Sequence, residues 1–208
     1  MRQSPRYFGA AVPRRSRRRF HCLLVDDEES IRNTTKRMLT QLGLEVSVLT
    51  DGEEVVPFLR RTGQLHASAG ATGGGGGGGG GGEGGGEGPS SDAEHPRPVD
   101  FILLDIVMAR SDGVDVCRQL VRDYNVVIPI VAMTANTTNA SLKMYRKVKF
   151  FGILSKPFSR QTIAKKIEFM CAPDGPVVAA RQAEAQMLTG MNQSESLHSV
   201  WGVLDRDL

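Results

Sequence analysis

Five short strand-like segments alternate with segments of helical periodicity, and this alternation restricts the fold more than any other feature of the chain. Four of them are apolar runs, at residues 20–25, 101–104, 126–133 and 152–155, and in the fifth, residues 45–49, apolar and polar residues alternate. The segments expected to be helical cover residues 28–42, 53–61, 114–124, 139–148 and 160–170. Apolar strands separated by helices indicate a parallel sheet that helices cover on both faces. We therefore predict an α/β fold, a doubly wound five-stranded parallel sheet.

Two residues bear on the helix boundaries. Gly43 follows the first predicted helix, at a position where glycine often ends a helix. Pro57 lies inside the helix predicted over residues 53–61. It argues against this helix, because a proline beyond the first turn removes a hydrogen bond.

A glycine-rich segment interrupts the alternation between residues 62 and 98. It contains ten consecutive glycines at positions 73–82. Such a segment cannot bury enough apolar surface to offset the entropy lost on ordering it, so we predict a flexible insertion. A glycine-rich phosphate loop would instead need a preceding strand, a following helix and a Lys-Ser/Thr pair. The segment lacks this context.

The folded domain is predicted to cover residues 20–170, with a tail at each end. Residues 1–19 contain seven arginines and no acidic residue. This basic segment could be a targeting presequence, a nuclear signal, an anion-binding arm or a solvated disordered tail. Residues 171–208 are predicted to be a C-terminal tail with one candidate short helix at 178–188. They are too few for a typical output domain of about 50 residues or more, so we expect no DNA-binding domain.

The composition favours a reducing compartment and argues against a membrane segment. Cys22, Cys117 and Cys171 are scattered without a CxxC spacing, so we expect free thiols rather than disulfides or a metal site. No apolar run approaches the roughly 18–20 residues that a membrane helix requires. We therefore expect an intracellular protein, cytoplasmic or nuclear.

Polar residues stand at the carboxyl ends of the predicted strands. Asp26 and Asp27 follow the first strand, Asp105 the third, Thr134 the fourth and Lys156 the fifth. Ligands of open α/β sheets bind beyond the carboxyl ends of the strands, so these side chains are expected to share one site. A nucleotide-binding domain would instead need glycines after the first strand, where the acidic residues would repel phosphates.

The chemistry of these side chains points to phosphoryl transfer. Three carboxylates at one site repel one another, and burial strengthens the repulsion. Mg²⁺ could relieve it by binding oxygen ligands from Asp27 and Asp105, with Asp26 contributing through water. Lys156 adds a compact positive charge. An aspartate that faces such cations is a good acceptor for a phosphoryl group, and Thr134 could donate a hydrogen bond to it.

Four short motifs, each at a strand end and in the correct order, resemble the two-component response-regulator receiver family. They are Leu23-Leu24-Val25-Asp26-Asp27-Glu28, Leu103-Leu104-Asp105-Ile106-Val107-Met108 with Asp112-Gly113, Val131-Ala132-Met133-Thr134-Ala135, and Ser155-Lys156-Pro157-Phe158. The resemblance covers residues 20–170 apart from the insertion. It implies the flavodoxin-like strand order 2-1-3-4-5.

The resemblance also implies a role for each residue of the site. Asp105 would be the phospho-acceptor. The ligands of Mg²⁺ would be Asp26, Asp27, Asp105 and the backbone carbonyl of Val107. Lys156 would pair with the phosphoryl group, and Thr134 would move to hydrogen-bond it. The peptide bond between Lys156 and Pro157 is usually cis in this family.

Two positions depart from the family pattern. The aromatic switch residue expected three positions before the lysine is Ile153, while Phe150 and Phe151 lie just upstream. The relay from Thr134 to the output face could therefore differ, or the phenylalanines could substitute. The loop proline expected four residues after the acceptor is Ala109, which is expected to loosen that loop.

These features predict a module for phosphorelay signal transduction. A phosphohistidine donor, either a histidine kinase or a phosphotransfer protein, would phosphorylate Asp105 and thereby switch a protein-interaction face. We do not expect the protein to be an enzyme. It would only assist its own phosphotransfer and autodephosphorylation. The alternatives are the receiver module of a larger hybrid kinase and a phosphorylation-incompetent pseudo-receiver that acts as a binding module. An aspartyl phosphatase is disfavoured because Val107 stands where its second aspartate would be.

Overall fold

The computed structural model describes residues 19–65 and 96–188 of the chain. The predicted basic tail, most of the glycine-rich insertion and the end of the C-terminal tail lie outside these residues. Five parallel strands form a sheet in the order β2-β1-β3-β4-β5, which confirms the predicted fold class and strand order. The strands are β1 (His21–Val25), β2 (Glu45–Leu49), β3 (Phe101–Asp105), β4 (Ile130–Thr134) and β5 (Gly152–Ser155).

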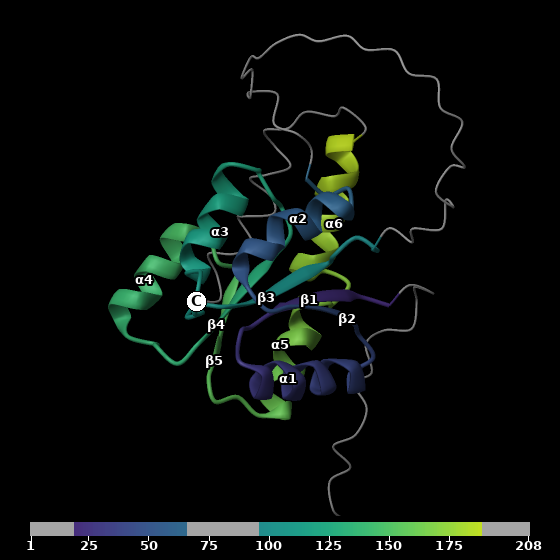
Figure 1. Ribbon diagram of the computed structural model, residues 1–208. Helices are drawn as coiled ribbons and strands as arrows, with labels where there is room; N and C mark the ends of the chain where they lie inside the picture. The colour runs from purple at the N-terminus through teal and green to yellow at the C-terminus, as the bar shows by residue number, and fades with distance from the viewer. Residues whose placement is uncertain (1–18, 66–95, 189–208) are drawn as a thin grey trace, which may run out of the picture.

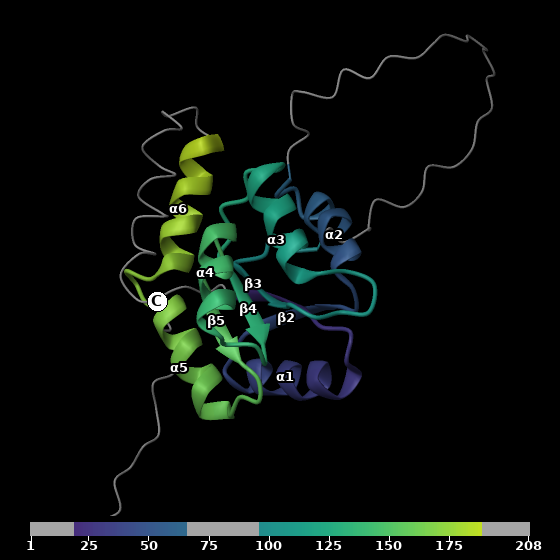
Figure 2. The same cartoon turned by 90° about the vertical axis from the view of Figure 1, so that its left-hand side faces the viewer.

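Helices cover both faces of this sheet (Figures 1 and 2). One face carries α1 (Glu29–Gln41) and α5 (Arg160–Met170), and the other carries α2 (Val55–Arg61), α3 (Gly113–Arg122) and α4 (Asn139–Val148). Successive side chains of a strand point to opposite faces, so each central strand contributes to two cores. In β1, Leu23 and Val25 pack with α2, α3 and α4, whereas Cys22 and Leu24 pack with α1 and α5. This double burial explains why the central strands β1, β3 and β4 are predominantly apolar.

Two prolines account for differences from the predicted element ranges. Pro57 is the third residue of α2, which follows the 3₁₀ turn η1 (Gly52–Glu54). The first N–H groups of a helix have no acceptor within it, so this proline costs α2 no hydrogen bond. The strand predicted over residues 126–133 begins only at Ile130, because Pro129 has no N–H to donate to a neighbouring strand.

A further helix, α6 (Pro176–Leu188), packs against the domain after α5. The sequence pattern predicts a tail with a candidate helix at 178–188, so the packed part of the chain extends farther than expected. Val177, Ala180 and Ala183 are buried. These small side chains make no strong apolar stripe, which is why the sequence pattern did not reveal the packing. No helix of the described ranges is both long and apolar enough to cross a membrane.

Arg181 anchors α6 at the amino end of the sheet. Its Nε lies 2.5 Å from Oδ1 of Asp100, and its guanidinium lies over the ring of Phe20, 4.5 Å from the centroid. The other carboxylate oxygen of Asp100 accepts a hydrogen bond from the backbone N–H of His21 at 2.6 Å. Because Asp100 is buried, its charge depends on these partners for stabilisation.

Two hydrogen bonds between Gln64 and Val99 join the chain on either side of the glycine-rich insertion. Gln64 Nε2 donates to the carbonyl of Val99 at 2.8 Å, and Gln64 Oε1 accepts from the N–H of Val99 at 2.6 Å. Val99 lies just before β3, so the chain enters and leaves the insertion at the amino end of that strand. This amino end of the sheet is opposite to the carboxyl ends of the strands, where the site residues lie.

Replacing Arg181 with alanine is expected to lower the free energy of unfolding by about 1.5–3 kcal/mol, because the buried Asp100 loses a charged hydrogen-bond partner. Urea unfolding followed by circular dichroism measures this change. Arg122→Ala truncates an exposed helical arginine and is the matched control, with an expected change below about 0.5 kcal/mol. Equal losses in the two variants would contradict the anchoring role.

Candidate functional site

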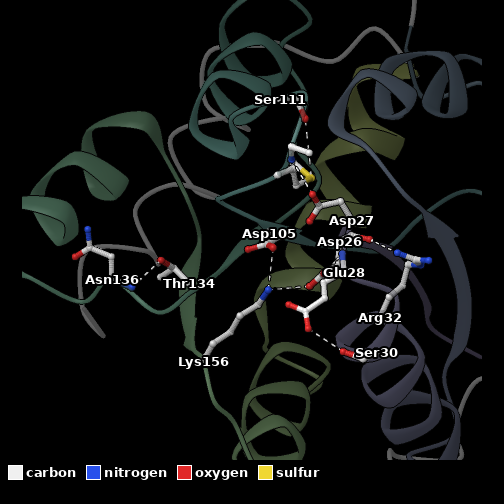
Figure 3. A network of polar contacts seen from close by, with 12 residues as sticks. Asp26, Asp27, Glu28, Ser30, Arg32, Asp105, Ser111, Thr134, Asn136 and Lys156 are labelled. Carbon is white, nitrogen blue, oxygen red and sulfur yellow. Dashed lines mark hydrogen bonds and ion pairs between the residues drawn. The ribbon is translucent and has the colours of Figure 1, made fainter.

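The carboxyl ends of β1, β3, β4 and β5 bring the predicted site residues together (Figure 3). Asp26 and Asp27 follow β1, Asp105 ends β3, Thr134 ends β4 and Lys156 follows β5. Asp26, Asp105 and Thr134 are buried, and Asp27 is more accessible. The parallel pairing of these strands produces the grouping, because strands that run in the same direction end at one edge.

Lys156 links the two buried carboxylates. Its Nζ lies 2.8 Å from Oδ2 of Asp26 and 2.8 Å from Oδ2 of Asp105. Burial lowers the pKa of Lys156, but its hydrogen bonds to Asp105 and Asp26 outweigh burial and raise that pKa above its usual value. The ammonium group therefore stays charged and serves two anions at once. The peptide bond between Lys156 and Pro157 is cis, as the family resemblance implied.

The carboxyl group of Asp105 is less acidic than an exposed aspartate. Burial is the main cause of its raised pKa, and the negative charge of Asp26 adds to it. Hydrogen bonds from Lys156 and from the backbone N–H of Val107 act in the opposite direction without overcoming burial. Further positive charge beside Asp105 would favour its ionised, nucleophilic form.

The acidic side chains fit a divalent metal ion. Carboxylate oxygens of Asp26, Asp27 and Asp105 lie within 4.8 Å of one another. Ionised, they bring three negative charges against the one positive charge of Lys156. A cluster of oxygen ligands with an excess of negative charge is the donor set that hard cations such as Mg²⁺ prefer.

The loop after β3 is held close to these carboxylates. The N–H of Ala109 donates a hydrogen bond to Oδ2 of Asp27 at 2.7 Å. We expected Ala109 to loosen the loop where the family pattern has proline, but alanine supplies an N–H that proline lacks. Val107 exposes 77% of its surface to solvent, and its backbone N–H bonds the carboxylate of Asp105. Its predicted role as a metal ligand therefore depends on its backbone and not on its side chain.

Gly113 allows this loop to close tightly against β3. Its N–H donates to the carbonyl of Ile106 at 2.9 Å. The preceding Asp112 accepts the N–H of Val114 at 2.7 Å and so caps α3. A Cβ atom at position 113 would lie 2.1 Å from the backbone oxygen of Asp105. This close approach requires glycine.

The hydroxyl of Thr134 is already engaged by neighbouring groups. Its Oγ1 accepts the N–H of Asn136 at 3.0 Å and lies 3.3 Å from Oη of Tyr145. Tyr145 is a buried residue of α4 that the sequence analysis did not identify. The spacing of Leu142, Tyr145 and Val148 was the available signal, because residues three apart share a helix face.

The predicted switch position and its aromatic neighbours take different places. Ile153 is partly buried and packs against the core that α2, α3 and α4 cover. Phe150 belongs to the same core and meets the ring of Tyr145 edge-on, with 5.8 Å between the centroids. Phe151 belongs to the opposite core and stacks on Phe169. Phe150 is therefore connected to the Thr134 hydroxyl through Tyr145.

Comparison with known proteins gives a family match for part of the chain. A model of the response regulator receiver domain matches residues 91–168. The transcription factor SKN7 of Candida albicans is 26% identical over 145 residues, which cover 70% of this chain and 20% of that protein. Probable histidine kinase 2 of Oryza sativa subsp. indica is 27% identical over 154 residues, which cover 73% of this chain and 13% of that protein. The chain thus matches a fifth or less of the length of these relatives.

Solved structures share the fold. The chemotaxis protein CheY4 of Vibrio cholerae superposes with a TM-score of 0.51 and 22% identity, covering 73% of this chain and 98% of that chain. A putative response regulator from Chloroflexus aurantiacus superposes with a TM-score of 0.53 and 16% identity, covering 74% and 99%. Because nearly all of each solved chain is covered, the described residues contain a whole domain of this fold.

Gly113→Ala is expected to lower the free energy of unfolding by about 1–3 kcal/mol, the usual cost of overpacking, because the added Cβ would meet rigid backbone. Gly152→Ala is the matched control, since its Cβ would approach the flexible end of the Lys166 side chain at 3.1 Å. Denaturant unfolding of both variants measures the difference. If Gly113→Ala is as stable as Gly152→Ala, the close approach of the loop to β3 is wrong.

Proposed function

We propose that this chain, which carries a response-regulator receiver domain, accepts a phosphoryl group on Asp105 in a phosphorelay. The observation that carries the proposal is the position of Lys156 Nζ, 2.8 Å from a carboxylate oxygen of Asp105 and 2.8 Å from one of Asp26. A carboxylate held beside a fixed cation can receive a phosphoryl group whose negative charge needs neutralisation.

The proposed donor is a phosphohistidine on a histidine kinase or a phosphotransfer protein. A carboxylate oxygen of Asp105 attacks phosphorus while the P–N bond breaks, and the electron pair of that bond remains on the imidazole nitrogen. Lys156 neutralises one phosphoryl oxygen, and the hydroxyl of Thr134 donates a hydrogen bond to another. The similarity to a plant protein named as a probable histidine kinase supports this class of donor.

Mg²⁺ is the proposed cofactor, and Asp26, Asp27, Asp105 and the backbone carbonyl of Val107 are its proposed ligands. When bound, the ion supplies positive charge that offsets the charge on the phosphoryl oxygens. Asp26 is already held by the N–H of Glu28 at 2.9 Å and by Lys156 at 2.8 Å. Its contribution is therefore expected through water, with Asp27 and Asp105 as the direct carboxylate ligands.

We further propose that the domain signals through protein contact and catalyses no reaction on another substrate. The complete set of two acidic residues, acceptor and lysine favours a working receiver over a pseudo-receiver. The second candidate is the receiver module of a larger hybrid kinase, favoured by the match to 13% of the length of a probable histidine kinase. A cytoplasmic or nuclear location agrees with the free thiols of Cys22, Cys117 and Cys171.

Incubation with acetyl phosphate and Mg²⁺ is expected to give an alkali-labile adduct on the parent protein and none on Asp105→Asn, because the amide is not a phosphate acceptor. Mass spectrometry of the intact protein measures the adduct. Asp115→Asn, which changes an exposed aspartate of α3, should be labelled like the parent. Labelling of Asp105→Asn at the parental level would rule out Asp105 as the acceptor.

Mg²⁺ is expected to stabilise the parent protein by mass action, by about 2.7 kcal/mol when the ion is present at 100 times its dissociation constant. Asp27→Ala should lose most of this gain and should no longer be phosphorylated, because a direct ligand is missing. Thermal unfolding with Mg²⁺ and with chelator gives the gain for each variant. Glu29→Ala, which removes a nearby exposed acid from α1, should keep it. Normal phosphorylation in excess chelator would refute the metal site.

A further inference from the structure

We propose that Tyr145 is the positioning residue that couples the Thr134 hydroxyl to helix α4. Both residues are 2% exposed, and their hydroxyl oxygens lie 3.3 Å apart inside the domain. Position 153, where the family pattern places an aromatic switch residue, holds an isoleucine that cannot form a hydrogen bond. The proposal rests on the proposed function, because it concerns how the domain responds to a phosphoryl group on Asp105.

The hydrogen bonds of the unphosphorylated protein form a closed cycle. The N–H of Asn136 donates to Thr134 Oγ1 at 3.0 Å, and the Tyr145 hydroxyl donates to the backbone carbonyl of Asn136 at 3.4 Å. Since the tyrosine proton is used there, the remaining bond is donated by the Thr134 hydroxyl to Tyr145 Oη. The buried hydroxyls of Thr134 and Tyr145 are thereby both satisfied.

Because of this cycle, the Thr134 hydroxyl cannot donate to Tyr145 and to a phosphoryl group on Asp105 at the same time. A threonine hydroxyl carries one proton and can donate one hydrogen bond. Donation to a phosphoryl oxygen on Asp105 therefore ends donation to Tyr145. The buried oxygen of Tyr145 then lacks a donor, which is costly unless Tyr145 or the helix that carries it moves.

The surroundings of Tyr145 transmit such a movement to the surface. Phe150, which follows α4, holds the tyrosine ring edge-on at 80° between the ring planes. Leu142 and Val148 pack into the same core from the same helix. On the outer side of α4, the neighbouring Met144 is 41% exposed. A displacement of the Tyr145 ring thus changes the position of a helix whose other face is available to a protein partner.

Binding of beryllium fluoride with Mg²⁺, which mimics a phosphoryl group on a carboxylate, tests the coupling. Tyr145→Phe keeps the ring and removes the hydroxyl, so Thr134 no longer has a bond to give up. It is expected to bind the mimic about 2- to 10-fold more tightly than the parent, the range that one hydrogen bond accounts for. Tyr124→Phe is the matched control, because the Tyr124 hydroxyl bonds Arg60 at 3.2 Å and should leave the affinity unchanged.

A double-mutant cycle separates coupling from a structural role. In a Thr134→Val background, Tyr145→Phe should have no further effect on affinity, whereas a general effect on packing would persist. Thr134→Ser keeps the hydroxyl and should restore the effect. The amide resonances of α4 should move on binding in the parent and move less in Tyr145→Phe.

The outcomes distinguish this proposal from the function on which it rests. A parent protein that binds no beryllium fluoride overturns the proposed function and the coupling with it. A parent that binds, with Tyr145→Phe equal to it in affinity and in α4 resonances, overturns the coupling alone. An affinity gain that persists unchanged in the Thr134→Val background also overturns the coupling, because the effect then does not pass through Thr134.

Discussion

Lys156 places one ammonium group between two buried carboxylates, and the rest of the site depends on this sharing of charge. The repulsion between Asp26 and Asp105 grows as both leave water, so β1 and β3 could not end side by side in the interior without a cation between them. The lysine side chain is long enough to reach from the end of β5, past β4, to both acids. Asp27 lies outside this pairing and brings a third carboxylate to the site, within reach of a metal ion.

The carboxyl and amino ends of the strands differ in the kind of contacts that they make. At the carboxyl ends of the strands, the buried charges and hydroxyls are held by hydrogen bonds that phosphorylation can rearrange, such as the bond between Thr134 and Tyr145. At the amino edge, Arg181, Asp100 and the paired bonds of Gln64 close the domain. The described residues on either side of the glycine-rich insertion, Gln64 and Val99, meet at this amino end, opposite the site.

The sequence was sufficient to predict most of the fold and the grouping of the candidate site residues at one end of the sheet. The apolar runs gave the strands, and the polar residues that end them gave the acidic side chains, Thr134 and Lys156, because parallel strands end at a common edge. The packing of helix α6 against the domain was not predicted, because Ala180 and Ala183 contribute to it without a strong apolar pattern. The effect of Pro57 was overestimated, because its cost depends on its distance from the start of the helix.

By itself, the sequence determined the order of strands and helices and the chemical groups at each strand end, because backbone periodicity and the burial of apolar side chains are local in their demands. The tertiary structure decided which of these groups form hydrogen bonds or ion pairs with one another. The Thr134–Tyr145 contact joins a strand end to a helix, and the bond between Ala109 and Asp27 spans two loops. Such contacts depend on distances of a few tenths of an ångström between segments far apart in the chain, and only the packed domain fixes those distances.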